Sequence, residues 1–134
     1  RRPGDAAAGY TLRRRDKMAS ILAVTSLDLT EEKKAKLSRD LIRNIGTVFP
    51  DAMSFTFKTI PPRFASAMAK DQTTFIVCLP KEYLPIEVKR ETARIFHETI
   101  LAHTGNRGKY KVIVLFWYHE AADLGKDGFL FSDL

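Results

Sequence analysis

The sequence predicts an α/β domain in which two tandem β-α-β units form a four-stranded mixed sheet with two helices on one face. Short apolar runs alternate with longer amphipathic segments, which is typical of strands and surface helices. The order strand–helix–strand occurs twice, with equivalent segments about 55 residues apart. At 134 residues, 45% hydrophobic and 28% charged, the chain has the size and composition of one globular domain.

The first unit begins with Ser20–Ser26, a β-branched apolar run of strand length. Residues 30–49 form an amphipathic pattern, with charged residues on one side and apolar residues at helical spacing on the other. The apolar positions are Leu37, Leu41, Ile45 and Val48. Pro50 ends this helix, and Met53–Ile60 alternates as the second strand.

The second unit repeats this order. Thr73–Leu79 is another apolar run of strand length, and a second helix is expected over residues 86–104. Pro85 suits the start of that helix and Gly105 its C-terminal cap. Lys111–Tyr118 is the last strand of the repeat. Parallel pairing within each unit through right-handed crossovers places both helices on the same face of the sheet.

The last strand is apolar on both of its sides, although only one side can face the helices. We therefore expect the other face of the sheet to be covered by a second chain, because an apolar patch of this size marks an association site. One row of the strand holds Ile113, Leu115 and Trp117. The predicted oligomer interface is the alternate row together with two C-terminal phenylalanines: Val112, Val114, Phe116, Tyr118, Phe129 and Phe131.

Neither a metal nor a cofactor is expected. His97 and His103 lie six apart on one predicted helix, far from a shared face, and His119 lies at a strand end. The chain contains no glycine-rich phosphate loop, and no apolar run approaches the roughly 20 residues of a membrane-spanning helix. Cys78 is the one cysteine, which excludes an internal disulfide and suits a reducing compartment. Because Cys78 lies within an apolar run, we expect a buried and inert thiol.

Basic residues are concentrated at the N-terminus. Residues 1–18 carry six basic and two acidic side chains and so contribute +4 of the formal net charge of +6. We separate this basic tail from a domain at residues 19–134. The composition of the tail fits either the remnant of a mitochondrial transit peptide or an arm that anchors the protein to an acidic partner. Mitochondrial localisation is expected, with a cytoplasmic location as the alternative.

Basic side chains in two places are candidates for partner or nucleic-acid contacts. Charge alone would let them follow an RNA backbone without reading its sequence, and the alternative is an acidic protein surface or no partner. No RNA-binding motif accompanies them. The candidates are Arg13, Arg14, Arg15 and Lys17 in the tail and Arg107, Lys109 and Lys111 before the last strand.

The tandem repeat and its ending, YHEAADLGKDGFLF over residues 118–131, resemble the tautomerase superfamily, most closely the branch of macrophage migration inhibitory factor and dopachrome tautomerase. Glu120–Gly125 takes the place of a short Asn-Ala-Ala-Asn-Val-Gly-like loop in that branch, and Phe131 matches a terminal phenylalanine. The resemblance covers residues 19–131. It implies a trimer, of identical or mixed chains, in which three sheets line a barrel and each C-terminal strand joins a neighbour's sheet.

The resemblance also implies a catalytic site that this sequence lacks. Tautomerases of the superfamily use an N-terminal proline as general base, since a secondary amine in an apolar pocket can remove a proton next to a carbonyl near neutral pH. Ala19 takes that place, preceded by residues 1–18. Val48 replaces a substrate-binding lysine, Ile113 and Leu115 replace a tyrosine and an asparagine, and Lys126 replaces an aromatic residue. These five degenerate positions indicate a pseudo-tautomerase.

Three hypotheses of function follow. The first is a non-catalytic structural or accessory subunit of a large mitochondrial assembly, with the mitochondrial ribosome favoured narrowly over a respiratory complex; ribosomal RNA would then be a partner of the tail. The second is an active tautomerase of phenylpyruvate-like or dopachrome-like substrates, whose base is exposed by cleavage before Ala19. The third is a cytokine-like signalling protein, for which only the resemblance argues.

Overall fold

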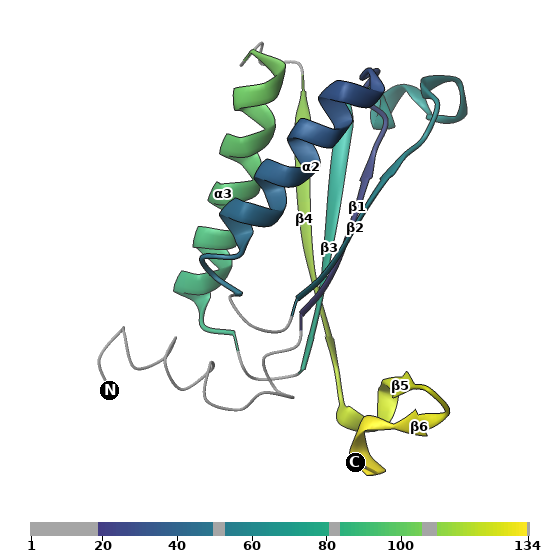
Figure 1. Ribbon diagram of the computed structural model, residues 1–134, viewed down its shortest axis with the longest axis vertical. Coiled ribbons are helices and arrows are strands. Elements are labelled where there is room, and N and C mark those ends of the chain that lie inside the picture. Colours follow the sequence, from purple (N-terminus) through teal and green to yellow (C-terminus); the bar gives the residue numbers. More distant parts are fainter. Residues whose placement is uncertain (1–18, 50–52, 81–83, 106–109, 134) are drawn as a thin grey trace.

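The structure, a computed structural model, describes residues 19–49, 53–80, 84–105 and 110–133. Figure 1 shows one sheet with two long helices packed against it. In chain order the main elements are β1 (Ala19–Thr25), α2 (Glu31–Ile45), β2 (Met53–Thr59), β3 (Gln72–Pro80), α3 (Ile86–Thr104) and β4 (Lys111–His119). The tail and the basic residues Arg107 and Lys109 lie outside the described residues.

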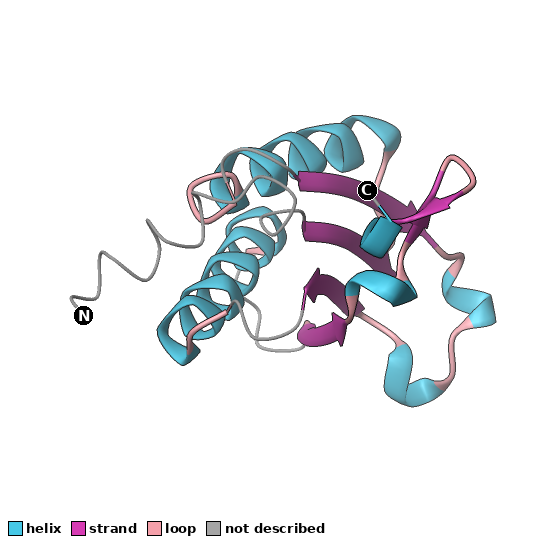
Figure 2. Ribbon diagram, turned by 90° about the horizontal axis from the view of Figure 1, so that it is seen from below, coloured by secondary structure: helices cyan, strands magenta, loops and turns pink. Residues whose placement is uncertain are grey.

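The sheet has the strand order β2-β1-β3-β4. β1 is parallel to β2, β3 is parallel to β4, and the two units meet where β1 and β3 run antiparallel. Both helices lie on the same side of the strands (Figure 2). The predicted mixed sheet of two β-α-β units, with both helices on one face, is therefore confirmed.

Local sequence signals set the ends of the helices. Thr30 caps α2, where its hydroxyl accepts a hydrogen bond from the backbone N–H of Lys33 at 3.2 Å. Pro85 precedes α3, and Gly105 closes it in the left-handed region at φ 81°. A side chain with a Cβ atom is strained in that region, so glycine is the favoured residue there. No helix in the described part of the chain is both long and apolar enough to cross a lipid bilayer.

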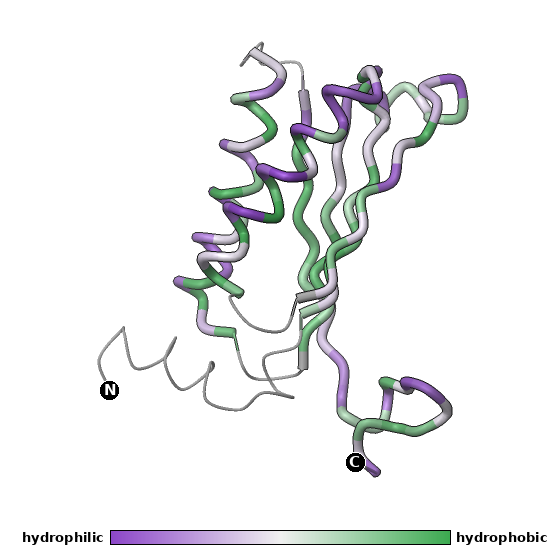
Figure 3. Tube along the Cα trace, viewed as in Figure 1, coloured by the Kyte–Doolittle hydropathy of each residue, from purple (hydrophilic) through white to green (hydrophobic). Residues whose placement is uncertain are grey.

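The core lies between the helices and one face of the sheet. In the Cα trace coloured by hydropathy, hydrophobic residues are frequent along the strands of the sheet (Figure 3). Phe75 of β3 stacks on Phe96 of α3 with ring centroids 3.9 Å apart and an angle of 2° between the ring planes. Neither ring has any exposed surface. This pair joins the central sheet to a helix. Other fully buried side chains include Ile21, Leu37, Leu41, Ile45, Leu79 and Ile100.

The two sides of β4 face opposite ways from the prediction: the row expected at the interface packs against the core, and the other row is exposed. The side chains of Val112, Val114, Phe116 and Tyr118 pack against the core on the helix side of the sheet. The other face, which we call the open face, instead presents Ile113, Leu115 and Trp117, which are 40%, 50% and 64% exposed. The rows were assigned wrongly because alternation along a strand defines two sides without saying which side the helices cover.

Beyond β4 the chain forms a small separate unit (Figure 1). The short helix η3 (Ala121–Asp123) leads into the two-stranded hairpin of β5 (Gly125–Lys126) and β6 (Phe129–Leu130), and η4 (Phe131–Asp133) follows. Asp127 and Gly128 make the hairpin turn with positive φ angles of 54° and 90°. We call residues 120–133 the C-terminal segment.

Candidate functional site

A cleft of about 490 Å³ lies at one end of the sheet. Four strands meet there, because the starts of the parallel strands β1 and β2 adjoin the ends of β3 and β4. The pairing aligns four open-face residues across the sheet: Ser54 with Ser20, Ser20 with Cys78, and Cys78 with Trp117. The remaining lining residues are Ala19, His119, Asp123, Leu124, Gly125, Lys126 and Phe131.

The C-terminal segment forms one wall of the cleft. Residues Glu120 and Asp123 cap η3 reciprocally, and the carboxylate of Asp123 accepts a hydrogen bond from the backbone N–H of Glu120 at 3.0 Å. The backbone N–H of Phe131 donates to the carbonyl of Leu124 at 2.8 Å. This bond fixes the C-terminal segment so that the Phe131 ring is buried, at 9% exposure.

The sequence predicted that Phe131 belongs to an oligomer interface. In the structure its ring instead lines the cleft of its own chain. Phe131 lines the cleft together with Ala19, which comes from the opposite end of the domain's sequence. Phe129 keeps its place as an interface candidate, since its side chain is 62% exposed on the hairpin.

Ala19 lines the cleft, yet it contributes no ionisable group. It is only 2% exposed, and its nitrogen forms the peptide bond to Met18. An amide nitrogen has no useful basicity. Within the uncleaved chain, Ala19 therefore brings no basic group to the cleft.

Among the other side chains of the cleft, the Cys78 thiol is a weak acid–base candidate. Burial raises the pKa of the Cys78 thiol, which keeps the thiol protonated and poorly nucleophilic. This agrees with the inert thiol predicted from the sequence, although Cys78 is only partly buried and lies on the open face. The Nδ1 atom of His119 lies 3.2 Å from the backbone carbonyl oxygen of Glu120, to which an N–H on this nitrogen would donate.

Of the five positions singled out as degenerate, Ala19 and Lys126 line the cleft and three do not. Val48 is half-buried beyond the end of α2 and packs against the core. Ile113 and Leu115 point from β4 to the open face. Within a single chain, the predicted pocket positions are thus divided between the cleft, the core and the open face.

Of the seven basic candidates, Lys111 alone lies within the described residues. Arg13, Arg14, Arg15, Lys17, Arg107 and Lys109 lie outside the described residues. Lys111 opens β4 at the other end of the sheet, and its ammonium group donates to the backbone carbonyl of Met68. Within the described ranges, no group of histidine, cysteine, aspartate and glutamate side chains is arranged to hold a metal ion.

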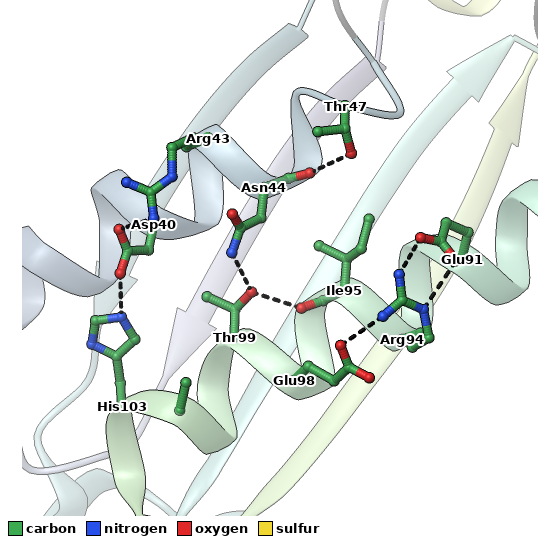
Figure 4. A pocket seen from close by; sticks show the side chains of 11 residues that line it. Asp40, Arg43, Asn44, Thr47, Glu91, Arg94, Ile95, Glu98, Thr99 and His103 are labelled. Carbon is green, nitrogen blue, oxygen red and sulfur yellow. Dashed lines mark hydrogen bonds and ion pairs between the residues drawn. The ribbon is translucent and has the colours of Figure 1, made fainter.

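A second cavity, of about 440 Å³, lies between α2 and α3 on the outer side of the helices. Figure 4 shows that its polar side chains point toward one another. The His103 ring nitrogen Nε2 lies 2.7 Å from Asp40, and the amide of Asn44 donates to the Thr99 hydroxyl at 3.0 Å. Arg94 pairs with Glu91 and Glu98 on α3 itself. This groove links the two helices, and its charged groups are paired with one another.

Sequence reasoning named part of the cleft without bringing it together. The resemblance singled out Ala19, Lys126, Phe131 and the loop that holds Asp123, Leu124 and Gly125, whereas Ser20, Ser54 and His119 carried no motif. The available signal was strand order: β1 antiparallel to β3 and parallel to β2 brings Ser20 beside both Cys78 and Ser54. The tandem repeat predicted the parallel pairing within each unit, but it could place neither the antiparallel β1–β3 junction nor the covering C-terminal segment.

Comparison with known proteins identifies the fold. No family model matches the sequence, and no curated protein matches it either. Solved structures do match. The "F6 fused 4-OT wild type asymmetric trimer" aligns with a TM-score of 0.68 and 14% identity over 85% of this chain and 97% of that one.

A macrophage migration inhibitory factor-like protein from Entamoeba histolytica aligns with a TM-score of 0.65 and 16% identity, over 84% of this chain and 98% of that one. Pt0534 inactivated by 2-oxo-3-pentynoate aligns with a TM-score of 0.60 and 18% identity, over 87% and 98%. The chain therefore has the tautomerase fold of macrophage migration inhibitory factor-like proteins, as its sequence predicted.

Proposed function

We propose that this chain is a non-catalytic, tautomerase-fold subunit of a large mitochondrial assembly, with the mitochondrial ribosome favoured over a respiratory complex. The observation that carries the proposal is the chemical form of the Ala19 nitrogen. The residue lines the cleft where a tautomerase needs a basic amine, but its nitrogen is an amide inside the chain. The tautomerase fold would then serve as a domain that binds other subunits rather than as a catalyst.

The thiol and the two hydroxyls of the cleft support this proposal. Proton transfer next to a carbonyl needs a base whose pKa lies near the working pH. The Cys78 thiol has a raised pKa, and Ser20 and Ser54 are alcohols without a described partner that would activate them. Lys126 lies in the exposed β5–β6 hairpin.

Assembly into a trimer is the second part of the proposal. The fused 4-OT structures with this fold are trimers. The open face of this chain exposes Leu22, Ile113, Leu115 and Trp117, and the hairpin exposes Phe129 and Leu130. A neighbouring copy, or a related chain in a mixed trimer, would remove this apolar surface from water. The basic tail would then anchor the trimer, through RNA phosphates or acidic protein side chains.

The second candidate function is a tautomerase activated by processing. The location of Ala19 in the cleft favours it, because cleavage after Met18 would leave a free amine at this position. That amine would be primary, with an ordinary pKa of about 7.7–8.0. It would carry out proton transfer less well than a secondary amine tuned by its pocket.

Turnover assays on two forms of the protein separate these candidates. The full chain and a chain that begins at Ala19 are each tested for isomerisation of phenylpyruvate and dopachrome. We expect no turnover above background from either form. Turnover by the full chain would overturn the proposal, whereas turnover by the shortened chain alone would establish the processed tautomerase.

The assembly itself is tested by recovery of the tagged protein from fractionated cells. We expect it in mitochondria, bound to a particle of ribosomal or respiratory-complex size. If RNA phosphates hold the tail, the complex should weaken steeply with salt, because condensed counterions are released on binding. Recovery as a small cytosolic trimer without larger partners would contradict the proposal.

A further inference from the structure

We propose that the groove between α2 and α3 is a docking site for an arginine side chain of a partner protein. The existence of such a partner rests on the proposed function, whereas the chemistry of the groove follows from its own contacts. The groove has a volume of about 440 Å³ and lies on the outer side of the helices. The open face lies on the opposite side of the sheet, so a neighbouring copy that covers it leaves the groove accessible.

Two hydrogen bonds in the groove fix the orientation of Asn44. The Thr99 hydroxyl, in a residue only 5% exposed, donates to the backbone carbonyl of Ile95 at 2.7 Å. Because its single hydrogen is used there, this hydroxyl can only accept from Asn44, whose amide nitrogen lies 3.0 Å away. The carbonyl oxygen of Asn44 therefore faces away from Thr99 (Figure 4), and it has no partner among the described residues.

The charged side chains of α3 leave a second acceptor in the groove. Arg94 uses its three guanidinium nitrogens to donate to Glu91 and Glu98. Glu98 accepts from Arg94 through one carboxylate oxygen, at 2.6 Å. The other oxygen of this carboxylate has no partner in the described part of the chain. The groove thus retains acceptors from both helices, whereas the donors of Arg94 are occupied.

The net charge of the groove favours a cation as its occupant. Three carboxylates line it, those of Asp40, Glu91 and Glu98, against the two guanidinium groups of Arg43 and Arg94. With histidine counted as neutral, one negative charge is left over, which attracts a cation and repels an RNA phosphate. A guanidinium group suits the spare oxygens, because it carries five N–H donors and no acceptor. Arginine is also enriched at the centres of protein interfaces, which favours a protein as its source.

The chemistry of the groove is tested with N-acetyl-arginine-N-methylamide as the probe. The comparison probe is N-acetyl-citrulline-N-methylamide, which has a similar shape and no charge. Nuclear magnetic resonance spectra of the isotope-labelled full chain follow the Asn44 side-chain amide and the backbone amides of α2 and α3 during each titration. We expect saturable shifts confined to the groove, with the arginine probe bound at least about fivefold more tightly than the citrulline probe.

Two substitutions that remove the same charge from α3 locate the site. Glu98 lines the groove, whereas Glu87, in the first turn of α3, does not. Glu98→Gln should weaken binding of the arginine probe at least about threefold, while Glu87→Gln should leave it within about 1.5-fold. Arg94 keeps its pairing with Glu91 in both variants, so α3 should stay folded, which far-UV circular dichroism checks.

Recovery of the tagged protein from fractionated cells tests the role of the groove in docking. Glu98→Arg reverses the charge in the groove and should lower recovery in the large particle at least about threefold, while Glu87→Arg should leave it within about 1.5-fold. Both positions lie on the helix side of the sheet. Sedimentation velocity should therefore show the same oligomeric state for both variants as for the natural chain.

Four outcomes would overturn the proposal: equal binding of the citrulline probe, equal binding of inorganic phosphate, shifts that lie outside the groove, or equal effects of the matched Glu98 and Glu87 substitutions. Tighter binding of phosphate would point to RNA as the occupant. If the natural chain enters no large particle, the proposed function fails and the docking role fails with it. The probe titration then still decides whether the groove binds arginine, so the two failures are distinguishable.

Discussion

Replacing Leu115 by aspartate should separate the subunits of the proposed trimer and leave the single chain folded. Leu115 lies on the open face of β4 and is 50% exposed. A neighbour that covers this face would bury the exposed half of the side chain. Because full burial of a leucine side chain is worth about 1.5–3 kcal/mol, the substitution removes about 1 kcal/mol per copy, or about 3 kcal/mol per trimer.

The new carboxylates add to this loss. Each must leave water without a partner, which costs at least about 1 kcal/mol per copy. The free energy of trimer formation should therefore weaken by roughly 5 kcal/mol or more, which lowers the association constant by more than about a thousandfold. Sedimentation velocity at micromolar concentration should show a trimer for the natural chain and a monomer for Leu115→Asp.

The adjacent residue provides the matched control. Val114 precedes Leu115 on β4 but packs against the core on the helix side. Val114→Asp buries an unpaired charge and should lower the free energy of unfolding by several kcal/mol, measured by urea denaturation. Leu115→Asp should change that quantity by less than about 1 kcal/mol. A trimeric Leu115→Asp variant, or a natural chain that is monomeric and well folded, would refute the assignment of the open face.

Three further predictions concern stability. Phe96→Ala should lower the free energy of unfolding by about 3–5 kcal/mol, because it leaves a cavity beside the stacked Phe75 ring; a loss under about 1 kcal/mol in urea denaturation would contradict the packing described. Thr30→Ala should cost about 1 kcal/mol through loss of the α2 cap, whereas Thr30→Ser should cost little. The hydrogen bond from His103, aided by the charge of Arg43, lowers the pKa of Asp40 below 3.8. The stability that ionised Asp40 contributes is therefore complete above pH 3.8 and is lost as the pH falls through the lowered pKa. The melting temperature of Asp40→Asn should therefore lie below that of the natural chain at pH 6 and approach it in stronger acid; a difference that does not change with pH would argue against this bond.

The sequence by itself determined the main strands and helices and the parallel pairing within each unit. Apolar runs bounded by proline gave the strands, and Leu37, Leu41 and Ile45 at helical spacing gave the inner face of α2. The order of these elements then fixed parallel pairing within each unit and helices on one face, because right-handed crossovers leave few other arrangements. The resemblance of residues 118–131 pointed to the fold that the solved structures share.

Only the tertiary structure decided how side chains from distant parts of the chain combine. Alternation along β4 separated Val114 from Leu115, but packing against α3 was needed to show which of them is covered. The cleft depends on the C-terminal segment folding back, so that Phe131 reaches the start of β1 and lines a cavity with Ala19. A local pattern records the period and the ends of an element, whereas contacts of this kind depend on how whole elements pack, which no short stretch of residues specifies.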